Sequence, residues 1–278
     1  EVGGEQIFTK IRIDQSSRFP KENRTGVFPS FSAGWVLSEE DFLKGNLGQV
    51  SFLKLRGSYG LIGNQDIGVY PYQNTMSSRL YYSFGSGTAG TVAVGIAPTS
   101  NVNEKISWEK TATSNVGTEI RLFRDKLGFI ADYYNRITYD VLVSVALPSV
   151  SGRTGNPYQN IGSVRNRGFE FTVNYSTMSE PKDFTYEVGF NVSTNRNKVI
   201  KLASEATIIT QGGAQSQYEY RTEEGNEINQ FYGYVQVGIF QNTDEIANWP
   251  LQKNAAPGDM KFKDLNDDKV IDSKDRKY

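Results

Sequence analysis

The acidic segment 264–275, with the sequence DLNDDKVIDSKD, contains residues that could bind an ion. An EF-hand-type calcium loop takes side-chain oxygens from loop positions 1, 3, 5, 9 and 12 and a backbone carbonyl from position 7. Aspartate or asparagine stands at each of those side-chain positions here. The spacing predicts a calcium site with these ligands: Asp264, Asn266, Asp268, the carbonyl of Val270, Asp272 and Asp275.

Two departures from that pattern keep a second interpretation open. Lys269 occupies the position where glycine normally permits the sharp turn, and Asp275 is shorter than the usual bidentate glutamate. No helix-forming pattern precedes the loop. The alternative is a solvated acidic turn, in which case the chain requires no cofactor.

The composition leaves little room for other chemistry. The 278 residues include no cysteine and no histidine, which removes thiol nucleophiles, disulfides, zinc–thiolate sites and the commonest general base. The formal net charge is −1, so nothing favours binding to nucleic acid. The carboxylates of 39–41 and 223–224 are adjacent along the chain, whereas a glycosidase pair converges from separate elements. We therefore expect the chain not to be an enzyme.

Aromatic side chains between residues 70 and 84 form a second candidate site. Tyrosine offers a flat apolar face with a polar tip, which suits stacking on sugar rings. The alternative is that the same rings pack the loop against itself or line a lipid interface. The candidate ligand-binding aromatics are Tyr70, Tyr72, Tyr81, Tyr82 and Phe84.

The elements that carry these loops are predicted to be strands, most clearly in the hairpin at 165–198. Apolar and polar residues alternate along both arms, so each strand has one apolar and one polar face. The second apolar run, 184–192, is long enough for a tilted strand to cross a bilayer. The predicted lipid-facing residues are Phe169, Phe171, Val173, Tyr175, Tyr186, Val188, Phe190 and Val192.

Other runs repeat this alternation and keep their charges on one parity, at 7–14, 53–59, 116–122 and 127–136. A membrane barrel requires this, because a cation at the bilayer midplane costs roughly 2–4 kcal/mol on the lipid face and little in a wet lumen. The pattern predicts an all-β fold, with about eight antiparallel strands of a larger transmembrane β-barrel. A large soluble antiparallel sheet with one solvated face remains the alternative.

The polar parity and the connections fit the same barrel. Short connections at 123–126 and 179–183 alternate with long ones at 61–105, 145–164 and 199–229, and outer-membrane barrels place the long loops outside. The charges of the polar parity are expected to form salt-bridge ladders across adjacent strands in the lumen. Those residues are Lys54, Arg56, Glu119, Arg121, Asp132, Arg136, Glu170 and Glu187.

A series of short motifs runs along nearly the whole chain. The motifs are IRIDQSSRF (11–19), FPSFSAGW (28–35), LKLRGSYG (53–60), GNQ (63–65), WEK (108–110), NVG (115–117), ADYY (131–134), NIG (160–162), NRGFE (166–170), FYGY (231–234), GIFQ (238–241) and PGD (257–259). In their identity and order they resemble the SusC/RagA family of TonB-dependent outer-membrane transporters of Bacteroidetes.

The resemblance implies a barrel of roughly 22 strands with an N-terminal plug. Residues 1–278 would supply part of that barrel domain, without plug or TonB box, and 257–278 would be an acidic loop. The resemblance also implies a SusD-like lipoprotein lid, energy from the TonB–ExbB–ExbD complex, contact with outer-membrane lipid, and a glycan or peptide as cargo. Alone, the chain is expected to aggregate and not to transport.

A function of another class stays open. A secreted β-sandwich or surface adhesin could bind glycans without transporting them. The two hypotheses differ in what covers the apolar face of the strands. Lipid covers it in the transporter, and a second packed sheet covers it in the sandwich.

Overall fold

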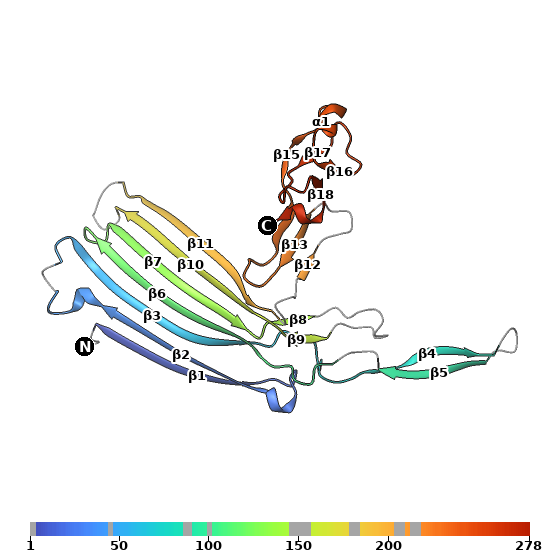
Figure 1. Ribbon diagram of the computed structural model, residues 1–278. Coiled ribbons are helices and arrows are strands. Elements are labelled where there is room, and N and C mark those ends of the chain that lie inside the picture. The colour runs from blue at the N-terminus through green and yellow to red at the C-terminus, as the bar shows by residue number, and fades with distance from the viewer. Residues whose placement is uncertain are drawn as a thin grey trace. The chain divides into compact units, whose positions relative to one another are not determined.

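The computed structural model describes residues 4–43, 47–85, 91–98, 102–144, 157–177, 184–202, 209–211 and 218–278. The chain divides into two compact units, Glu1–Lys201 and Leu202–Tyr278 (Figure 1). In the described part of the chain, no helix is both long enough and apolar enough to cross a membrane.

The first unit is built on a seven-stranded antiparallel sheet with the order β1-β2-β3-β6-β7-β10-β11 (Figure 1). The strands are β1 (Glu5–Gln15), β2 (Thr25–Val36), β3 (Val50–Asn64), β6 (Glu109–Leu122), β7 (Leu127–Tyr139), β10 (Ser163–Ser176) and β11 (Glu187–Lys201). The shortest, β1, has 11 residues, which is enough for a tilted strand to cross hydrocarbon. The antiparallel all-β fold is confirmed, although the sheet holds one strand fewer than the eight or so expected.

The hairpin β10–β11 confirms the antiparallel pairing predicted for 165–198 but moves the start of its second arm. That arm was predicted to begin at 184, whereas β11 begins at Glu187. The second arm begins later because Tyr186 still belongs to the turn, where it is hydrogen-bonded to Thr177. Thr177 N–H donates to the Tyr186 carbonyl (3.0 Å), and Tyr186 N–H donates to Thr177 Oγ1 (2.9 Å).

The described connections confirm the short turn at 123–126 and the long connections after β3 and β7, whereas the predicted turn at 179–183 lies outside the described residues. The turn between β6 and β7 has only the residues 123–126, and three of them, Phe123, Arg124 and Asp125, have positive φ. At the other end of the sheet, β3 and β6 are joined through the hairpin of β4 (Met76–Phe84) and β5 (Thr91–Pro98). There, too, β7 and β10 are joined through β8 (Leu142–Ser144) and β9 (Tyr158–Asn160).

The buried core of the first unit lies at the long-connection end of the sheet. It consists of Phe19, Phe28, Ile67, Ile106 and Trp108. The Trp108 ring lies 5.1 Å from the Phe19 ring and 5.4 Å from the Phe28 ring, and its Nε1–H donates to a backbone carbonyl. Burying each such side chain contributes roughly 1.5–3 kcal/mol. The core therefore ties the ends of the strands together, and the two faces of the sheet stay open.

The second unit contains only short strands. They are β12 (Ile209–Gln211), β13 (Tyr218–Thr222), β14 (Gln230–Tyr234), β15 (Gln236–Ile239), β16 (Leu251–Gln252), β17 (Met260–Phe262), β18 (Val270–Ile271) and β19 (Arg276–Lys277). A four-stranded sheet has the order β12-β13-β14-β19, and β15 pairs with β17 and β16 with β18. With at most 5 residues in a strand, the described strands of this unit are too short to span hydrocarbon.

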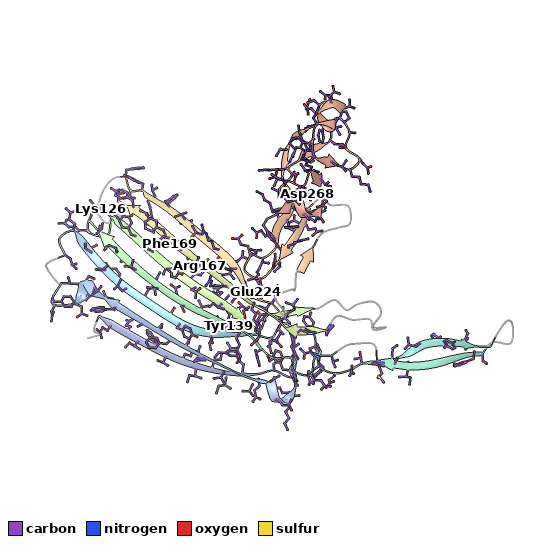
Figure 2. All side chains as sticks on the ribbon, viewed as in Figure 1. Lys126, Tyr139, Arg167, Phe169, Glu224 and Asp268 are labelled. Atoms are coloured by element: carbon purple, nitrogen blue, oxygen red, sulfur yellow. The ribbon has the colours of Figure 1, made fainter. Side chains whose placement is uncertain are left out.

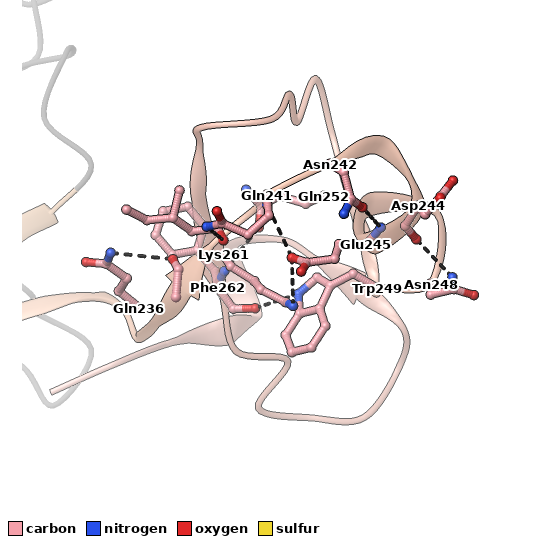
Figure 3. A network of polar contacts seen from close by, with 12 residues as sticks. Gln236, Gln241, Asn242, Asp244, Glu245, Asn248, Trp249, Gln252, Lys261 and Phe262 are labelled. Atoms are coloured by element: carbon pink, nitrogen blue, oxygen red, sulfur yellow. Dashed lines mark hydrogen bonds and ion pairs between the residues drawn. The ribbon is translucent and has the colours of Figure 1, made fainter.

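A polar network holds α1 (Thr243–Ala247) against the short strands of this unit (Figure 3). Asn242 caps the helix, because its side chain accepts the Glu245 N–H at 2.9 Å. Lys261 Nζ lies 4.1 Å from the centre of the Trp249 ring and 3.6 Å from the Glu245 carboxylate. Trp249 Nε1–H donates to the Phe262 carbonyl at 2.9 Å. One lysine thus joins the helix, the indole and β17.

Candidate functional site

The register of the seven-stranded sheet assigns each side chain to one of two faces. Residues directly opposite each other on neighbouring strands share a face. Asp132 pairs with Gly117 on one side and with Glu170 on the other, and Gly117 pairs with Arg56. The eight residues predicted to face the lumen all lie on this face, which we call the charged face.

Arg56 and Asp132 meet over the strand that separates them. Arg56 lies on β3 and Asp132 on β7, and both pair with Gly117 on β6. Arg56 Nε and Nη2 lie 3.1 and 2.5 Å from the two Asp132 oxygens, which is a bidentate contact. A Cβ atom on Gly117 would overlap the carboxylate and the guanidinium. Glycine at this position therefore gives the ion pair its space.

A second contact of the same kind joins β7 to β11. The Tyr134 hydroxyl donates to Asn195 Oδ1 at 3.1 Å, above Gly168 on β10, which pairs with both residues. A Cβ atom on Gly168 would overlap the Tyr134 ring and the backbone carbonyl of Thr194. Sequence reasoning missed this contact. The available signal was a glycine in the middle of a strand on the polar parity.

The other predicted ladder residues pair within one strand or not at all. Arg121 contacts Glu119, two residues away on β6, at 2.6 Å. In the described part of the chain, Lys54, Arg136, Glu170 and Glu187 form no ion pair. The prediction of ladders between adjacent strands was therefore wrong, because the closest cross-strand pair spans a third strand instead.

The charged face holds a hollow of about 460 Å³. Its lining includes Lys54, Arg56, Asp132 and Glu170, so both signs of charge lie beside one another. Neutral side chains such as Ser58 and Asn115 complete the surface. The hollow can donate and accept hydrogen bonds, which suits the recognition of polar groups.

The opposite face of the sheet is apolar and exposed, and we call it the apolar face. Its pairs include Phe171↔Val192 and Val173↔Phe190, so the predicted lipid-facing residues of β10 and β11 share it. Phe190 exposes 63% of its surface. Exposed large residues on the same face of other strands are Ile7, Ile11, Ile13, Val27, Phe31, Leu55, Tyr59, Val116 and Tyr133.

The five candidate aromatics do not form one site. Tyr72 packs against the buried core, with the Tyr70 ring 6.3 Å away. The rings of Tyr82 and Phe84 lie 4.8 Å apart on one side of the β4–β5 hairpin, and Tyr81 alternates to the other side. Sugar binding stays a prediction, with the exposed Tyr82 and Phe84 as the closer of the two ring pairs.

The backbone of the acidic segment adopts the tight turn that the predicted calcium loop requires. Lys269 has a φ of +65°, the left-handed conformation that glycine supplies at that position. Its N–H donates to Asp264 Oδ2 at 2.8 Å, and the Val270 N–H donates to Asp268 Oδ1 at 2.9 Å. Lysine at the glycine position therefore does not prevent the turn (Asp268 is labelled in Figure 2).

The carboxylates of this segment bind backbone N–H groups. Asp275 is fully buried, and its two oxygens accept the N–H groups of Leu265 and Asp272 at 2.8 Å each. Burial raises the pKa of Asp275, but the backbone hydrogen bonds outweigh burial, so the pKa lies below its usual value. Asp272 in turn caps the turn Ser273–Asp275.

One oxygen of the segment fits a bound cation. Asp264 Oδ1 is buried and accepts no hydrogen bond. However, among the residues that the structure describes, no three acidic, cysteine or histidine side chains are placed to hold a metal. Asp268 and Asp272 each accept a backbone N–H through Oδ1, from Val270 and Lys274 respectively. Calcium binding by this segment stays a prediction.

Comparisons with known sequences agree on one family. The family described as "TonB dependent receptor-like, beta-barrel" matches residues 9–254. A TonB-dependent receptor of Formosa agariphila is 36% identical over 244 residues, which are 88% of this chain and 22% of the relative. The TonB-dependent receptor SusC of Bacteroides thetaiotaomicron is 34% identical over 97% of this chain and 26% of the relative.

Solved structures give the same answer. The RagAB peptide transporter matches with a TM-score of 0.71 and 28% identity, over 86% of this chain and 25% of that chain. The RagAB peptide importer in its closed-closed state matches with a TM-score of 0.71 and 25% identity, over 98% of this chain and 28% of that chain. The chain spans about a quarter of the length of these relatives.

Proposed function

This chain belongs to the TonB-dependent receptor-like β-barrel family, and on that premise we propose that its seven long strands form part of the lipid-facing wall of an importer. The family is one of outer-membrane transport proteins and not of enzymes. Within such a barrel the apolar face would contact lipid, and the charged face would line the lumen.

The difference between the two faces of one sheet carries this proposal. Val188 and Phe190 expose 61% and 63% of their surfaces on the apolar face, while Arg56 and Asp132 pair on the charged face. A soluble sandwich would cover apolar side chains with a second sheet about 10 Å away. Exposed apolar residues on every strand of the sheet favour lipid as the covering material.

Alternating single cysteines in the intact parent receptor test the assignment of the faces. Val173→Cys lies on the apolar face and Thr172→Cys on the charged face of the same strand. With a spin label at each site in lipid nanodiscs, we expect position 173 to be relaxed by dissolved oxygen and position 172 by a water-soluble nickel complex. Equal accessibility at the two positions would refute the lipid-facing wall.

We further propose that the parent receptor imports a glycan or a peptide. The lid would be a SusD-like lipoprotein and the energy would come from TonB–ExbB–ExbD. The support is the similarity to SusC and to the RagAB peptide transporter, together with a hollow that offers polar groups of both signs. Cargo that enters such a lumen must be polar, because apolar cargo would leave the charges of Lys54 and Glu170 without water or partners.

Uptake by whole cells tests the cargo and the partner. A strain without the parent receptor is complemented with the receptor, and labelled oligosaccharides and labelled oligopeptides are supplied in separate cultures. We expect uptake of one class, and we expect uptake to stop when TonB or the SusD-like lipoprotein is removed. Uptake that continues without TonB would contradict the proposal.

A further inference from the structure

We propose that the apolar face ends in a binding site for the phosphate of anionic lipid headgroups. Four cations form this site, which we call the basic block. Arg165 and Arg167 lie on β10, and Arg196 and Lys198 lie on β11. The inference rests on the proposed function, because it takes the apolar face to be the lipid-facing one.

The register places the four cations on the face that carries the apolar residues. Arg165 pairs with Lys198, and Arg167 pairs with Arg196. The next pair along the same face is Phe169 with Thr194. In Figure 2, Arg167 lies nearer than Phe169 to the end of the sheet marked by Tyr139, and Lys126 marks the other end. The rule that charges avoid the apolar parity therefore fails only where the strands extend beyond the predicted apolar runs.

The basic block has no counter-charge in the described part of the chain. None of its four cations forms an ion pair there, and Arg165 Nε is buried without an acceptor. The neighbouring strand β7 presents Asn135 and Ile137 to Arg167 and Arg165. Like charges opposite each other repel, so two such pairs side by side favour a bound anion.

No acidic residue of this sheet lies on the apolar face near the block. On that face the described strands carry one acidic residue, Glu5, which pairs with Trp35 at the short-turn end of the sheet. The block lies at the opposite, long-connection end. The anion must therefore come from outside this part of the chain.

The position of the block selects a lipid rather than a free ion. Arg167 and Arg165 lie two and four residues beyond Phe169, which is roughly 7–14 Å along a strand. The cost of a cation on the lipid face falls steeply from the midplane to the interface, where the headgroups begin. A ligand that fills both the block and the neighbouring apolar surface must join an anionic head to an apolar tail.

Arginine suits this ligand chemically. Its planar guanidinium binds two oxygens of one phosphate at once and is less strongly hydrated than an ammonium group. Three of the four cations in the block are arginines. The long-connection end corresponds to the outside of the barrel in the proposed function, so the lipid would belong to the outer leaflet.

Lipid retention by the intact parent receptor tests the inference. The receptor is placed in phosphatidylcholine nanodiscs that contain a small fraction of phosphatidylglycerol, and the lipids that stay bound are measured by native mass spectrometry. The test variant changes the block to glutamine: Arg165→Gln, Arg167→Gln, Arg196→Gln and Lys198→Gln. We expect this variant to retain at least roughly tenfold less phosphatidylglycerol than the unchanged receptor, and the same amount of phosphatidylcholine.

A matched control removes the same charge elsewhere. Its changes are Lys21→Gln, Lys105→Gln, Lys253→Gln and Lys263→Gln, all at exposed positions outside the block. We expect phosphatidylglycerol retention to stay as in the parent. If the glutamine variant fails to assemble, a variant with lysine at the three arginine positions keeps the charge and must retain the lipid at reduced strength. Retention by the unchanged receptor must also fall with added salt.

The outcomes separate this inference from the proposed function. Equal retention by the parent and the glutamine variant, with the accessibility pattern of positions 172 and 173 intact, overturns the lipid site alone. Loss of that accessibility pattern overturns the proposed function instead. Retention that inorganic phosphate abolishes at millimolar concentration overturns the choice of lipid over free ion. Loss of a protein partner from the variant, without loss of lipid, shows that the block docks protein.

Discussion

The charged face of the sheet and the acidic segment satisfy their carboxylates in opposite ways. On the charged face, Asp132 reaches a guanidinium 76 residues away in sequence, over a glycine of a third strand. In the acidic segment, Asp275 accepts N–H groups from residues within 10 positions of itself. The first arrangement exists only once the strands are aligned, whereas the second can form within a single loop.

This difference has a consequence for stability. A contact that spans three strands depends on the register of all of them, so one misplaced atom in the middle strand disturbs both outer strands. A loop that bonds to its own backbone depends on its turn residues alone. We therefore expect substitutions in the sheet to act on the whole first unit and substitutions in the segment to act locally.

The largest effect is expected for Gly168→Ala in the parent receptor. Its new Cβ would overlap the Thr194 carbonyl, which is backbone and cannot move aside, so β10 and β11 must separate. We expect a loss of about 3 kcal/mol in unfolding free energy, measured by urea titration of the receptor in detergent. Gly128→Ala on the same face is the control, because the nearest atom would lie 3.9 Å from its Cβ. Equal losses in the two variants would contradict the crossing geometry.

The next effect is local, at Asp275→Asn. The amide cannot accept the N–H groups of both Leu265 and Asp272, so one buried donor loses its partner. We expect about 2 kcal/mol of lost protection in hydrogen exchange of segment 257–278, with no change in the large sheet. The exposed Asp267, with a φ of +58°, provides the control Asp267→Asn. A change that spreads into β10 and β11 would show that the segment is not self-contained.

The same substitution fixes the sign of a pH dependence. The pKa of Asp275 is lowered in the folded chain, so its stabilisation is present above the unfolded pKa of about 3.9. That stabilisation is lost as the pH falls through the folded pKa. Hydrogen exchange of the segment in the parent should therefore rise as the pH is lowered below about 4, after correction for intrinsic rates. In Asp275→Asn this contribution should be absent.

A smaller effect is expected from the ion pair on the charged face. A double-mutant cycle with Arg56→Gln and Asp132→Asn should give a coupling energy of about 0.5–1 kcal/mol, because the arginine is partly exposed to solvent. The cycle for Arg12 and Asp14, two residues apart on β1, is the comparison. It should give almost none, because Arg12 is largely exposed and residues so close along the chain can also pair in the unfolded state. Equal coupling energies in the two cycles would show that the contact over Gly117 is no stronger than an ion pair within one strand.

The smallest effect is expected from calcium. Extracellular calcium modules bind with dissociation constants near 1 mM, so 1 mM calcium would stabilise segment 257–278 by about 0.4 kcal/mol. Lys269→Gly should strengthen the effect, because glycine adopts positive φ without strain. The measurement is hydrogen exchange with and without calcium. Magnesium at the same concentration is the control, and an identical response to both ions would refute a calcium-specific loop.

Local alternation predicted the strands well and their ends less well. The apolar run at 169–175 lies within β10, and the turn at 123–126 lies where expected. The second arm of the hairpin begins later than predicted, because the contact between Thr177 and Tyr186 closes the turn. Alternation records which residues share a face, but it does not record where a ladder of hydrogen bonds stops.

The candidate sites were less predictable than the fold. The eight charges do share a face, as their parity indicates, but the partner of Arg56 is on the second strand away. Parity defines a face and leaves the partner open, since any long side chain on that face is within reach when a glycine lies between. The alternation also did not predict the basic block. The strands continue beyond the apolar runs, and the rule that charges lie on one parity was derived from those runs alone.

The amino-acid sequence by itself determined the two-faced strands, the short turn at 123–126, and the family. These depend on periodicity and on local residue choice, both of which act within one strand or turn. Only the tertiary structure decided which charges pair, that Gly117 and Gly168 make room for contacts above them, and that four cations gather beside the apolar face. Those features arise from register, which hydrogen bonds between distant segments fix and which no single strand encodes.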